Sequence, residues 1–469
     1  MALFSNLDKY KKKIAFIETS GNFITYSNLI EDLLFLEKLN ISGPIILVAS
    51  NNYFSLLVYI YCIRKKITLI LLDNKIKKED LIEVIKNYKP YNLVIPKLFD
   101  IKKNLSNVRY IYKNDQYIVY KFYKNKNLKT KINLLLPTSG SMGKSKFVML
   151  TNSNLLSNTE SITKYLKIKS KEISITTMPP NYSYMLSVIN TYINSGAAVV
   201  INNYSVLQKD FWKILNDFKV SNFNGVPYIY EIIMRIGLEK LNTGYMNKIT
   251  QAGGRLDKKI VLDILNFCSK SSINFTLMYG QTEASPRISY LEHKFIYNKP
   301  ESIGKVIPNG KMWLVNSNNK LIKKPHLEGA IVYKGRNVYH GYANRIQDIQ
   351  RLKKNNFKLY TGDIGKFDED NFFYITSRKK RIIKIIGYRI SLEDLEGQLS
   401  SKNFKTICIG KKNQIIIYAE KLYNKKRIIN LASKITNLNS KFFTFIFLNK
   451  IPRTSSNKIN YKYLDNYND

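Results

Sequence analysis

Residues 136–146 read LPTSGSMGKSK, and they indicate the fold more sharply than any other stretch of the chain. They follow an apolar, strand-like run at 132–136 and precede a helix-like stretch that begins after Thr151. A loop rich in Ser, Thr and Gly after a strand exposes backbone N–H groups and hydroxyls, and glycine lets a ligand approach the backbone closely. The stretch therefore predicts a phosphate-binding loop, although taken alone it also suits a surface turn. Thr138 stands where a nucleotide-triphosphatase P-loop needs glycine, which argues against that motif.

Short apolar runs alternate with helix-like segments around this loop. The runs at 44–49 (PIILVA) and 67–72 (ITLILL) predict buried strands, with a helix over 52–65 between them. Buried strands separated by helices favour βαβ units and a mostly parallel sheet. The same rhythm predicts further strands at 91–96, 108–112, 173–179, 197–202, 223–226 and 275–279, and helices at 205–218 and 258–269.

The pattern of apolar and turn-forming residues changes from about Gly304 onward. Short β-type runs with Gly and Asn turns come first, at 312–315, 330–333 and 372–375. A separate α+β pattern follows the basic run SRKKR at 377–381, with strands near 405–409, 414–418 and 443–448. We therefore expect an α/β protein of two domains. The N-terminal domain, 1–377, would hold mixed and parallel sheets flanked by helices plus a β-rich subdomain, and a small mobile α+β domain would span 378–469.

The composition is that of a globular chain. Of 469 residues, 45% are hydrophobic and 23% are charged, which excludes disorder along the whole length. Lys and Arg number 75 and Asp and Glu 34, so the formal net charge is +41. A charge of this size suits nucleic acid or another anionic partner. The positive residues are spread along the chain without a long unbroken tract, however, so compositional bias explains them better.

Cysteine usage and hydropathy indicate the compartment. Cys62, Cys268 and Cys408 lie far apart without metal-ligand spacing, which favours buried thiols in a reducing compartment. The three histidines are too scattered for a zinc site. The N-terminus lacks an apolar core of signal-peptide length, and the longest apolar run, 54–63, is too short to span a bilayer. We expect a soluble, cytoplasmic protein with no membrane span.

Further motifs follow the phosphate loop in a fixed order: YGQTE at 279–283, YTGD at 360–363, RKKRIIKIIGYRISLEDLE at 378–396 and PRTSSNK at 452–458. In this order and spacing the set resembles the adenylate-forming (AMP-binding) superfamily of acyl- and aryl-CoA synthetases, luciferases and adenylation domains. The resemblance covers essentially the whole chain. YSYMLSV at 182–188, QAGG at 251–254 and MYGQTE at 278–283 are similar to bacterial acyl-CoA synthetase/AMP-acid ligase II proteins.

The resemblance implies ATP and Mg²⁺ as cofactors. Glu283 would bind the magnesium ion, because a hard cation prefers carboxylate oxygen, and Thr282 would contact the α-phosphate. From the residues alone, Glu283 could also be a solvated loop acid. Met142 and Ser145 depart from the family's usual Thr and Pro. The loop residues that would hold the β- and γ-phosphates are Thr138, Ser139, Gly140, Ser141, Gly143 and Lys146.

The resemblance also assigns the nucleoside and the acyl-transfer half. Asp363 would accept both ribose hydroxyls with Arg378 as a second contact, although a turn Asp in TGD is an ordinary feature. Tyr279 would stack on adenine or be a buried tyrosine. Gly253, Gly254 and Gly280 would let the base and phosphates approach the backbone. Lys458 matches the family's catalytic lysine, with Asn457 in place of the usual Gly. Lys380 matches the hinge residue of the family, and Gly387 matches its thiol-tunnel region.

The acid pocket follows from the same resemblance: Tyr182, Met185, Phe223, Gly225 and Met278 would line it. Several of these are core-forming types as well. Amino-acid adenylation domains carry an Asp where Met185 stands, so a zwitterionic amino acid bound in the usual way is disfavoured.

We therefore predict an AMP-forming acid–thiol ligase. A small carboxylic acid and ATP would give an acyl-adenylate and pyrophosphate, and the thiol of coenzyme A or of a carrier protein's phosphopantetheine would take the acyl group. One alternative is an amino-acid adenylation enzyme that loads a carrier protein. Another is a catalytically inactive basic protein that binds nucleic acid, which the presence of Glu283, Asp363 and Lys458 disfavours.

Overall fold

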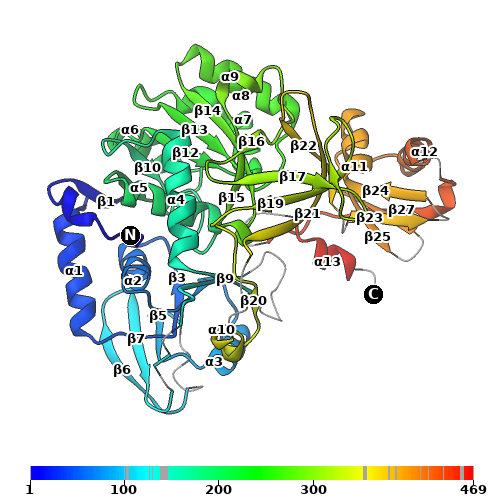
Figure 1. Ribbon diagram of the computed structural model, residues 1–469. Coiled ribbons are helices and arrows are strands. Elements are labelled where there is room, and N and C mark those ends of the chain that lie inside the picture. Colours follow the sequence, from blue (N-terminus) through cyan, green and yellow to red (C-terminus); the bar gives the residue numbers. More distant parts are fainter. Residues whose placement is uncertain are drawn as a thin grey trace. The chain divides into compact units, whose positions relative to one another are not determined.

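The computed structural model describes residues 2–467 except 100, 102–104, 126, 129, 138–145, 352–355, 379–380, 386–387, 412–413, 421, 437 and 455–458 (Figure 1). Contacts divide the chain into two compact units. The first unit comprises Met1–Lys311 and Lys334–Leu359, and the second comprises Met312–Tyr333 and Tyr360–Asp469. This division groups the β-rich segment with the C-terminal residues. The domain boundary that we expect at 377–378 stays a prediction.

The described strands of the first unit include a nine-stranded sheet in the order β16-β15-β14-β13-β12-β10-β11-β1-β2. Neighbours from β14 to β1 run parallel, and both edges are antiparallel. This arrangement agrees with the mostly parallel sheet predicted from the apolar runs. The strands are β1 (Ile14–Glu18), β2 (Phe23–Thr25), β10 (Ile173–Ile175), β11 (Ala198–Ile201), β12 (Asn222–Gly225), β13 (Lys248–Gln251), β14 (Asn274–Gly280), β15 (Arg287–Leu291) and β16 (Lys305–Val306).

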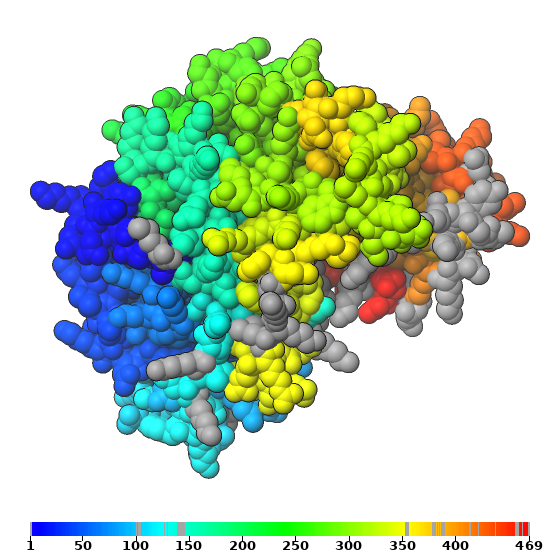
Figure 2. Space-filling view, viewed as in Figure 1, coloured from blue at the N-terminus to red at the C-terminus, as the bar shows by residue number. Residues whose placement is uncertain are grey.

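An eight-stranded sheet follows the order β20-β9-β8-β4-β3-β5-β7-β6 among the described strands. The central β8, β4, β3 and β5 are parallel, and hairpins extend both edges. Residues 334–359 return to this sheet, and their yellow atoms lie against cyan residues of the first unit in the space-filling view (Figure 2). The strands are β3 (Ile45–Ala49), β4 (Leu69–Asp73), β5 (Asn92–Pro96), β6 (Val108–Lys113), β7 (Tyr117–Phe122), β8 (Leu134–Pro137), β9 (Phe147–Leu150) and β20 (Tyr342–Ala343).

Two helices of the first unit, α2 (Tyr53–Arg64) and α5 (Ser183–Asn194), are buried along nearly their whole length. A helix that is apolar on every side must be covered on every side, so the apolar run at 54–63 belongs to the core. Tyr59 donates a hydrogen bond to Asn190 Oδ1 at 2.8 Å and joins the two helices. The other helices are α1 (Tyr26–Lys38), α3 (Lys78–Tyr88), α4 (Asn152–Leu166), α6 (Lys209–Asp217), α7 (Pro227–Ile236), α8 (Lys258–Lys270), α9 (His293–Ile296) and α10 (Ile346–Gln350).

The second unit joins a five-stranded sheet to an α+β core. The sheet order is β18-β17-β19-β21-β22 among the described strands, with β17 (Lys311–Val315), β18 (Leu321–Ile322), β19 (Gly329–Lys334), β21 (Lys358–Phe367) and β22 (Phe373–Arg378). In the α+β core, α11 and α12 pack on a three-stranded sheet around Ile415, Ile417 and Phe443. Its elements are β23 (Ile382–Ile385), β24 (Tyr388–Ser391), α11 (Leu392–Ser401), β25 (Ile407–Lys411), β26 (Gln414–Ala419), α12 (Lys425–Thr436), β27 (Phe443–Phe447) and α13 (Tyr461–Asp465).

The three cysteines are buried, as the sequence predicts, and burial raises the pKa of the Cys268 thiol to about 12. Among the described residues, none of the helices combines the length and apolar character that a membrane crossing requires.

Candidate active site

The YGQTE motif lies where strand β14 ends and the chain turns into β15. Gly280 closes β14, and a short 3₁₀ helix over Thr282–Ala284 leads to the first residue of β15, Arg287. Gly280 and Arg287 are partners in the antiparallel register. A Cβ added at Gly280 would lie 1.7 Å from the carbonyl oxygen of Pro286, so only glycine fits this close approach. The turn is therefore held by the backbone itself.

Glu283 is joined to Lys146 through one tyrosine. Tyr342, in β20, donates a hydrogen bond to Glu283 Oε1 at 2.9 Å. The ammonium nitrogen of Lys146 lies 3.6 Å from the centroid of the Tyr342 ring. Burial, together with the charge of Glu283, raises the pKa of Tyr342 well above its ordinary value, so the phenol keeps its proton. The structure thus brings together a predicted phosphate contact and the predicted magnesium ligand.

The residues around Glu283 suit a magnesium ion that is shared with phosphate. The carboxylate supplies hard oxygen ligands, and the bond from Tyr342 fixes one of them. The described part of the chain holds no group of three or more His, Cys, Asp or Glu side chains that could bind a metal by themselves. Glu283 would therefore hold Mg²⁺ together with phosphate oxygens and water, as ATP sites commonly do.

Thr282 meets the N-terminus of helix α5. Its hydroxyl lies 3.1 Å from the hydroxyl of Ser183, the first residue of that helix. The sequence does not single out Ser183 or Tyr342 as site residues. Ser183 lies within the quoted YSYMLSV motif, where its neighbour Tyr182 is the predicted pocket residue, whereas Tyr342 is one of 34 tyrosines and lies in no motif.

Tyr182 and the QAGG loop are packed against each other. Gly253 has a φ of +91°, and a Cβ there would lie 2.6 Å from the Tyr182 hydroxyl oxygen. At Gly254, a Cβ would lie 3.2 Å from Pro227 Cγ. Gly253, which we expect beside adenine, is therefore in close contact with Tyr182, which we expect beside the acid, and Gly254 packs on Pro227. Burial raises the pKa of Tyr182 to about 12, so its hydroxyl is neutral and can donate a hydrogen bond.

The other predicted pocket residues lie deeper. Met185 and Phe223 are fully buried, and the Phe223 ring packs edge-on against Tyr230 with centroids 5.9 Å apart. A Cβ at Gly225 would lie 2.6 Å from the same Tyr230 ring. These contacts make Phe223 and Gly225 part of the core, and their contact with a ligand stays a prediction.

Met278 has polar neighbours that the sequence does not indicate. Its sulfur accepts hydrogen bonds from Tyr165 Oη at 3.0 Å and from Arg287 Nε at 3.3 Å. Tyr279, the next residue, is buried and pairs with Ser289 of β15. Met278 and Tyr279 are thus fixed by the strand pair that also carries Arg287.

In the second unit, Asp363 and Arg378 are partners in the register of β21 and β22, so the two residues expected to bind ribose lie opposite each other. The Asp363 amide donates to Thr361 Oγ1 at 3.1 Å, and both residues lie within strand β21 and not in a turn. The remaining predictions fall outside the described residues and stay predictions: Thr138, Ser139, Gly140, Ser141, Gly143, Lys380, Gly387 and Lys458.

Comparison with known sequences identifies relatives. A family described as AMP-binding enzyme matches residues 4–343. The luciferin 4-monooxygenase of Photuris pensylvanica is 25% identical over 364 residues, which cover 74% of this chain and 66% of that protein. The long-chain-fatty-acid–CoA ligase of Bacillus subtilis is 28% identical over 273 residues, or 57% and 48% of the two chains. The matched part is thus less than two thirds of either relative's length.

Solved structures agree on the fold. The o-succinylbenzoate coenzyme A synthetase of Bacillus subtilis in complex with AMP gives a TM-score of 0.78 at 19% identity, covering 99% of this chain and 98% of that chain. The same synthetase in complex with ATP and magnesium gives 0.76 at 20% identity, covering 98% of each chain. At this identity the likeness establishes the fold alone.

Proposed function

The chain belongs to the AMP-binding enzyme family, and from this premise we propose that it activates a carboxylic acid with ATP and passes the acyl group to a thiol. The observation that carries the proposal is the cluster of Lys146, Tyr342 and Glu283 at the end of β14. The Lys146 ammonium group and the Glu283 carboxylate both contact one neutral tyrosine, Tyr342. The ammonium group suits a polyphosphate, and the carboxylate suits a metal ion that neutralises part of the phosphate charge.

In the first step a carboxylate oxygen of the acid attacks the α-phosphorus of ATP. A phosphorus–oxygen bond forms to the acid, the bond to the β-phosphate oxygen breaks, and pyrophosphate leaves with the electron pair. Lys146 would attract the departing phosphates, and Thr282, oriented by Ser183, would donate to an α-phosphate oxygen. Magnesium held by Glu283 would neutralise charge on the phosphate oxygens. Lys458 would bridge the carboxylate and the α-phosphate.

In the second step the thiol sulfur attacks the acyl carbon, AMP leaves, and the thiol proton passes to solvent. Rotation of the C-terminal domain about Lys380 would bring Gly387 to the thiol. Relatives named CoA ligases favour coenzyme A as the acceptor over a carrier protein. The buried, uncharged Met185 favours an acid without an α-ammonium group. We place the reaction in the cytoplasm, which agrees with three reduced, buried thiols.

The test is acid-dependent ATP–pyrophosphate exchange over fatty, aryl, hydroxy and amino acids. We expect exchange with one acid class. Glu283→Gln should lower it about 10²- to 10³-fold, the loss typical of one preorganised electrostatic group, and Lys458→Ala should lower it by a similar factor. Tyr342→Phe is the matched milder change, because it keeps the ring under Lys146 and removes the hydroxyl that donates to Glu283. Absence of exchange with every acid, from folded protein that binds ATP, would contradict the proposal.

The nucleic-acid alternative has a separate test. A protein that binds DNA through its lysines and arginines loses affinity steeply as salt rises. We expect no tight DNA binding at physiological salt, because the positive residues are dispersed along the chain. Tight, strongly salt-dependent binding together with a lack of exchange would favour that alternative.

A further inference from the structure

Arg287, the first residue of β15, is a buried cation. It is 3% exposed. Its guanidinium carbon lies 4.2 Å from the centroid of the Tyr184 ring, and its Nε donates to Met278 Sδ at 3.3 Å. Its charge also opposes the effect of burial on the pKa of Tyr165. Aromatic rings and a thioether can stabilise a guanidinium without neutralising its charge.

No carboxylate within the described ranges forms an ion pair with Arg287. Taking a charge out of water is costly unless a partner compensates for it. Two other cations that are largely removed from solvent have such partners: Lys248 pairs with Glu172, and Arg381 pairs with Glu396. The guanidinium has five N–H donors, and the hydrogen bond from Nε to the Met278 thioether leaves the terminal donors available. An anion from outside the chain would supply the charge that balances this site.

The guanidinium borders the predicted acid pocket. It contacts Met278, which we expect to line that pocket. Its charge opposes the effect of burial on the pKa of Tyr182, so it acts on the hydroxyl beside Gly253. Tyr184, under the guanidinium, belongs to the same α5 turn as Tyr182 and Met185. Two predicted pocket residues, Met278 and Tyr182, thus lie near one cation that no described carboxylate neutralises.

We propose that Arg287 forms an anion subsite in the acid pocket and that the acid activated here carries a second carboxylate. The inference rests on the proposed function and narrows its substrate to dicarboxylic acids. One carboxylate would react at the α-phosphate, and the other would accept two N–H donors of Arg287, the geometry that a guanidinium offers a carboxylate. A site built for a buried ionic contact discriminates strongly against an analogue that lacks it.

The experiment measures exchange with matched acid pairs: glutarate and butyrate, adipate and hexanoate, and phthalate and benzoate. We expect wild type to prefer one dicarboxylate over its monocarboxylate partner by at least about 10²-fold. Arg287→Met should remove that preference by lowering exchange with the dicarboxylate and leaving the monocarboxylate within about threefold. Arg287→Lys should keep part of the preference, because lysine keeps the positive charge but lacks the paired N–H donors of a guanidinium. Arg109→Met is the control, because it also removes one arginine charge. Arg109 lies in the outer strand β6, and its guanidinium lies over the Tyr123 ring.

Two outcomes overturn the subsite while leaving the proposed function intact: a wild-type preference for monocarboxylates, or an equal loss with both acids in Arg287→Met. A lack of exchange with every acid overturns the proposed function instead. In that case a binding measurement tests the subsite. The dicarboxylate should raise the melting temperature of the protein, and its monocarboxylate partner should not. We expect this rise in melting temperature in wild type and in Arg109→Met, and we expect Arg287→Met to lack it. Arg287→Gln replaces Arg287→Met if the Met variant does not fold. A wild-type protein that shows no such rise overturns the subsite.

Discussion

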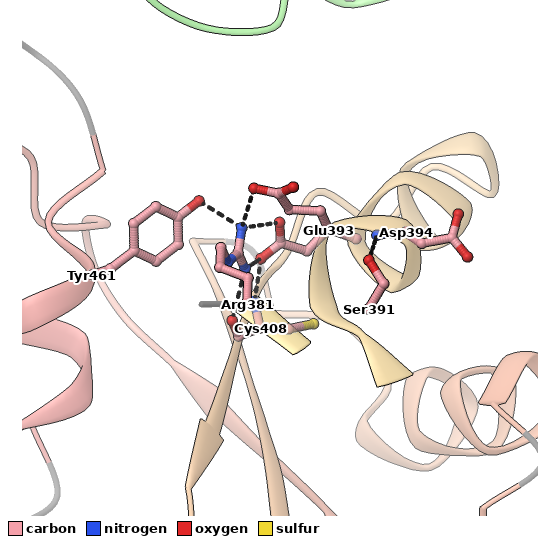
Figure 3. A network of polar contacts seen from close by, with 7 residues as sticks. Arg381, Ser391, Glu393, Asp394, Cys408 and Tyr461 are labelled. Atoms are coloured by element: carbon pink, nitrogen blue, oxygen red, sulfur yellow. Dashed lines mark hydrogen bonds and ion pairs between the residues drawn. The ribbon is translucent and has the colours of Figure 1, made fainter. Parts of the chain in front are cut away.

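The two arginines Arg381 and Arg287 are both removed from solvent, and their surroundings are opposite. Arg381, in the second unit, has a side chain 12% exposed and donates to Glu396 Oε2 at 3.0 Å and Oε1 at 2.5 Å. It also donates to Tyr461 Oη and to the Cys408 carbonyl oxygen, both at 2.9 Å (Figure 3). Arg287, in the first unit, contacts the Tyr184 ring and the Met278 sulfur, and it forms no ion pair with a carboxylate among the described residues.

The difference separates a structural cation from one available to a ligand. Arg381 joins helix α11, strand β25 and helix α13, and the Cys408 amide donates to the same Glu396 carboxylate at 2.6 Å. Burial alone would lower the pKa of Arg381, but the hydrogen bonds and charge of Glu396 raise it above its ordinary value. Its donors are taken up by the protein itself. Arg287 keeps terminal donors, which is the property of a binding group.

Replacing Arg381 should have the largest effect on stability. Arg381→Met leaves the buried Glu396 without its cation, and breaking a buried pair in this way costs about 3–5 kcal/mol. Chemical denaturation followed by Trp313 fluorescence in β17 of the same unit would measure the destabilisation. Arg427→Met, which removes an exposed arginine above the Phe404 ring, is the control. The double variant Arg381→Met with Glu396→Leu should recover most of the stability, and failure to recover would mean that the pair is not the cause.

Gly280→Ala should show that the backbone, not an ion pair, holds Arg287. The new Cβ would lie 1.7 Å from the Pro286 carbonyl oxygen, so β14 and β15 must separate next to Arg287. Forcing atoms into a packed site costs about 1–3 kcal/mol, and the dicarboxylate preference should fall with it. Gly397→Ala is the matched control, because its Cβ meets nothing within 4 Å in helix α11. That control should gain about 0.5–1 kcal/mol. Wild-type stability and preference in Gly280→Ala would contradict this view.

Arg287→Met should change the free energy of unfolding much less than Arg381→Met. No described carboxylate loses its cation through the change, and the substitution removes a buried cation–π interaction of about 2 kcal/mol. Relief from burying a charge without a carboxylate partner offsets part of that destabilisation. Denaturation followed by circular dichroism gives the comparison. A destabilisation as large as that of Arg381→Met would mean that Arg287 is a structural cation too, and the distinction between the two would fail.

The sequence predicts the scaffold better than the partners of its polar residues. Apolar runs at 44–49 and 414–418 correspond to β3 (Ile45–Ala49) and β26 (Gln414–Ala419), because strand burial is written into local residue types. Glu283 and Thr282 are recognisable through their motif. Tyr342 is not, because its bond to Glu283 depends on how β20 reaches the sheet edge.

The arginines show the same limit. Arg381 lies in a basic run that suggests a solvated surface, yet it is buried on Glu396. Arg287 begins the apolar strand RISYL, which is the signal that could have drawn attention to it. Whether such a cation has a carboxylate partner depends on the side chains of helices α4 and α5, which come from elsewhere in the sequence. The residues next to Arg287 in the chain do not indicate which side chains those are.

The smallest expected effect concerns His293, a half-buried histidine. His293 Nδ1 accepts from the Phe275 amide of β14 at 3.0 Å, and Nε2 lies 3.1 Å from Ser269 Oγ. Burial lowers the pKa of His293 below its ordinary value of about 6.5. The unfolded chain therefore binds this proton more readily than the folded one. The stability contribution is complete above about pH 6.5 and declines as the pH falls through that value.

His293→Gln should remove that decline and leave the rest of the pH dependence unchanged. Denaturation midpoints of wild type and variant between about pH 5 and 8 would test this, since histidine is the side chain that ordinarily titrates in that range. The difference between the two midpoints should narrow on acidification, because only wild type loses stability there. A constant difference would show that His293 is no more buried in the folded chain than in the unfolded one.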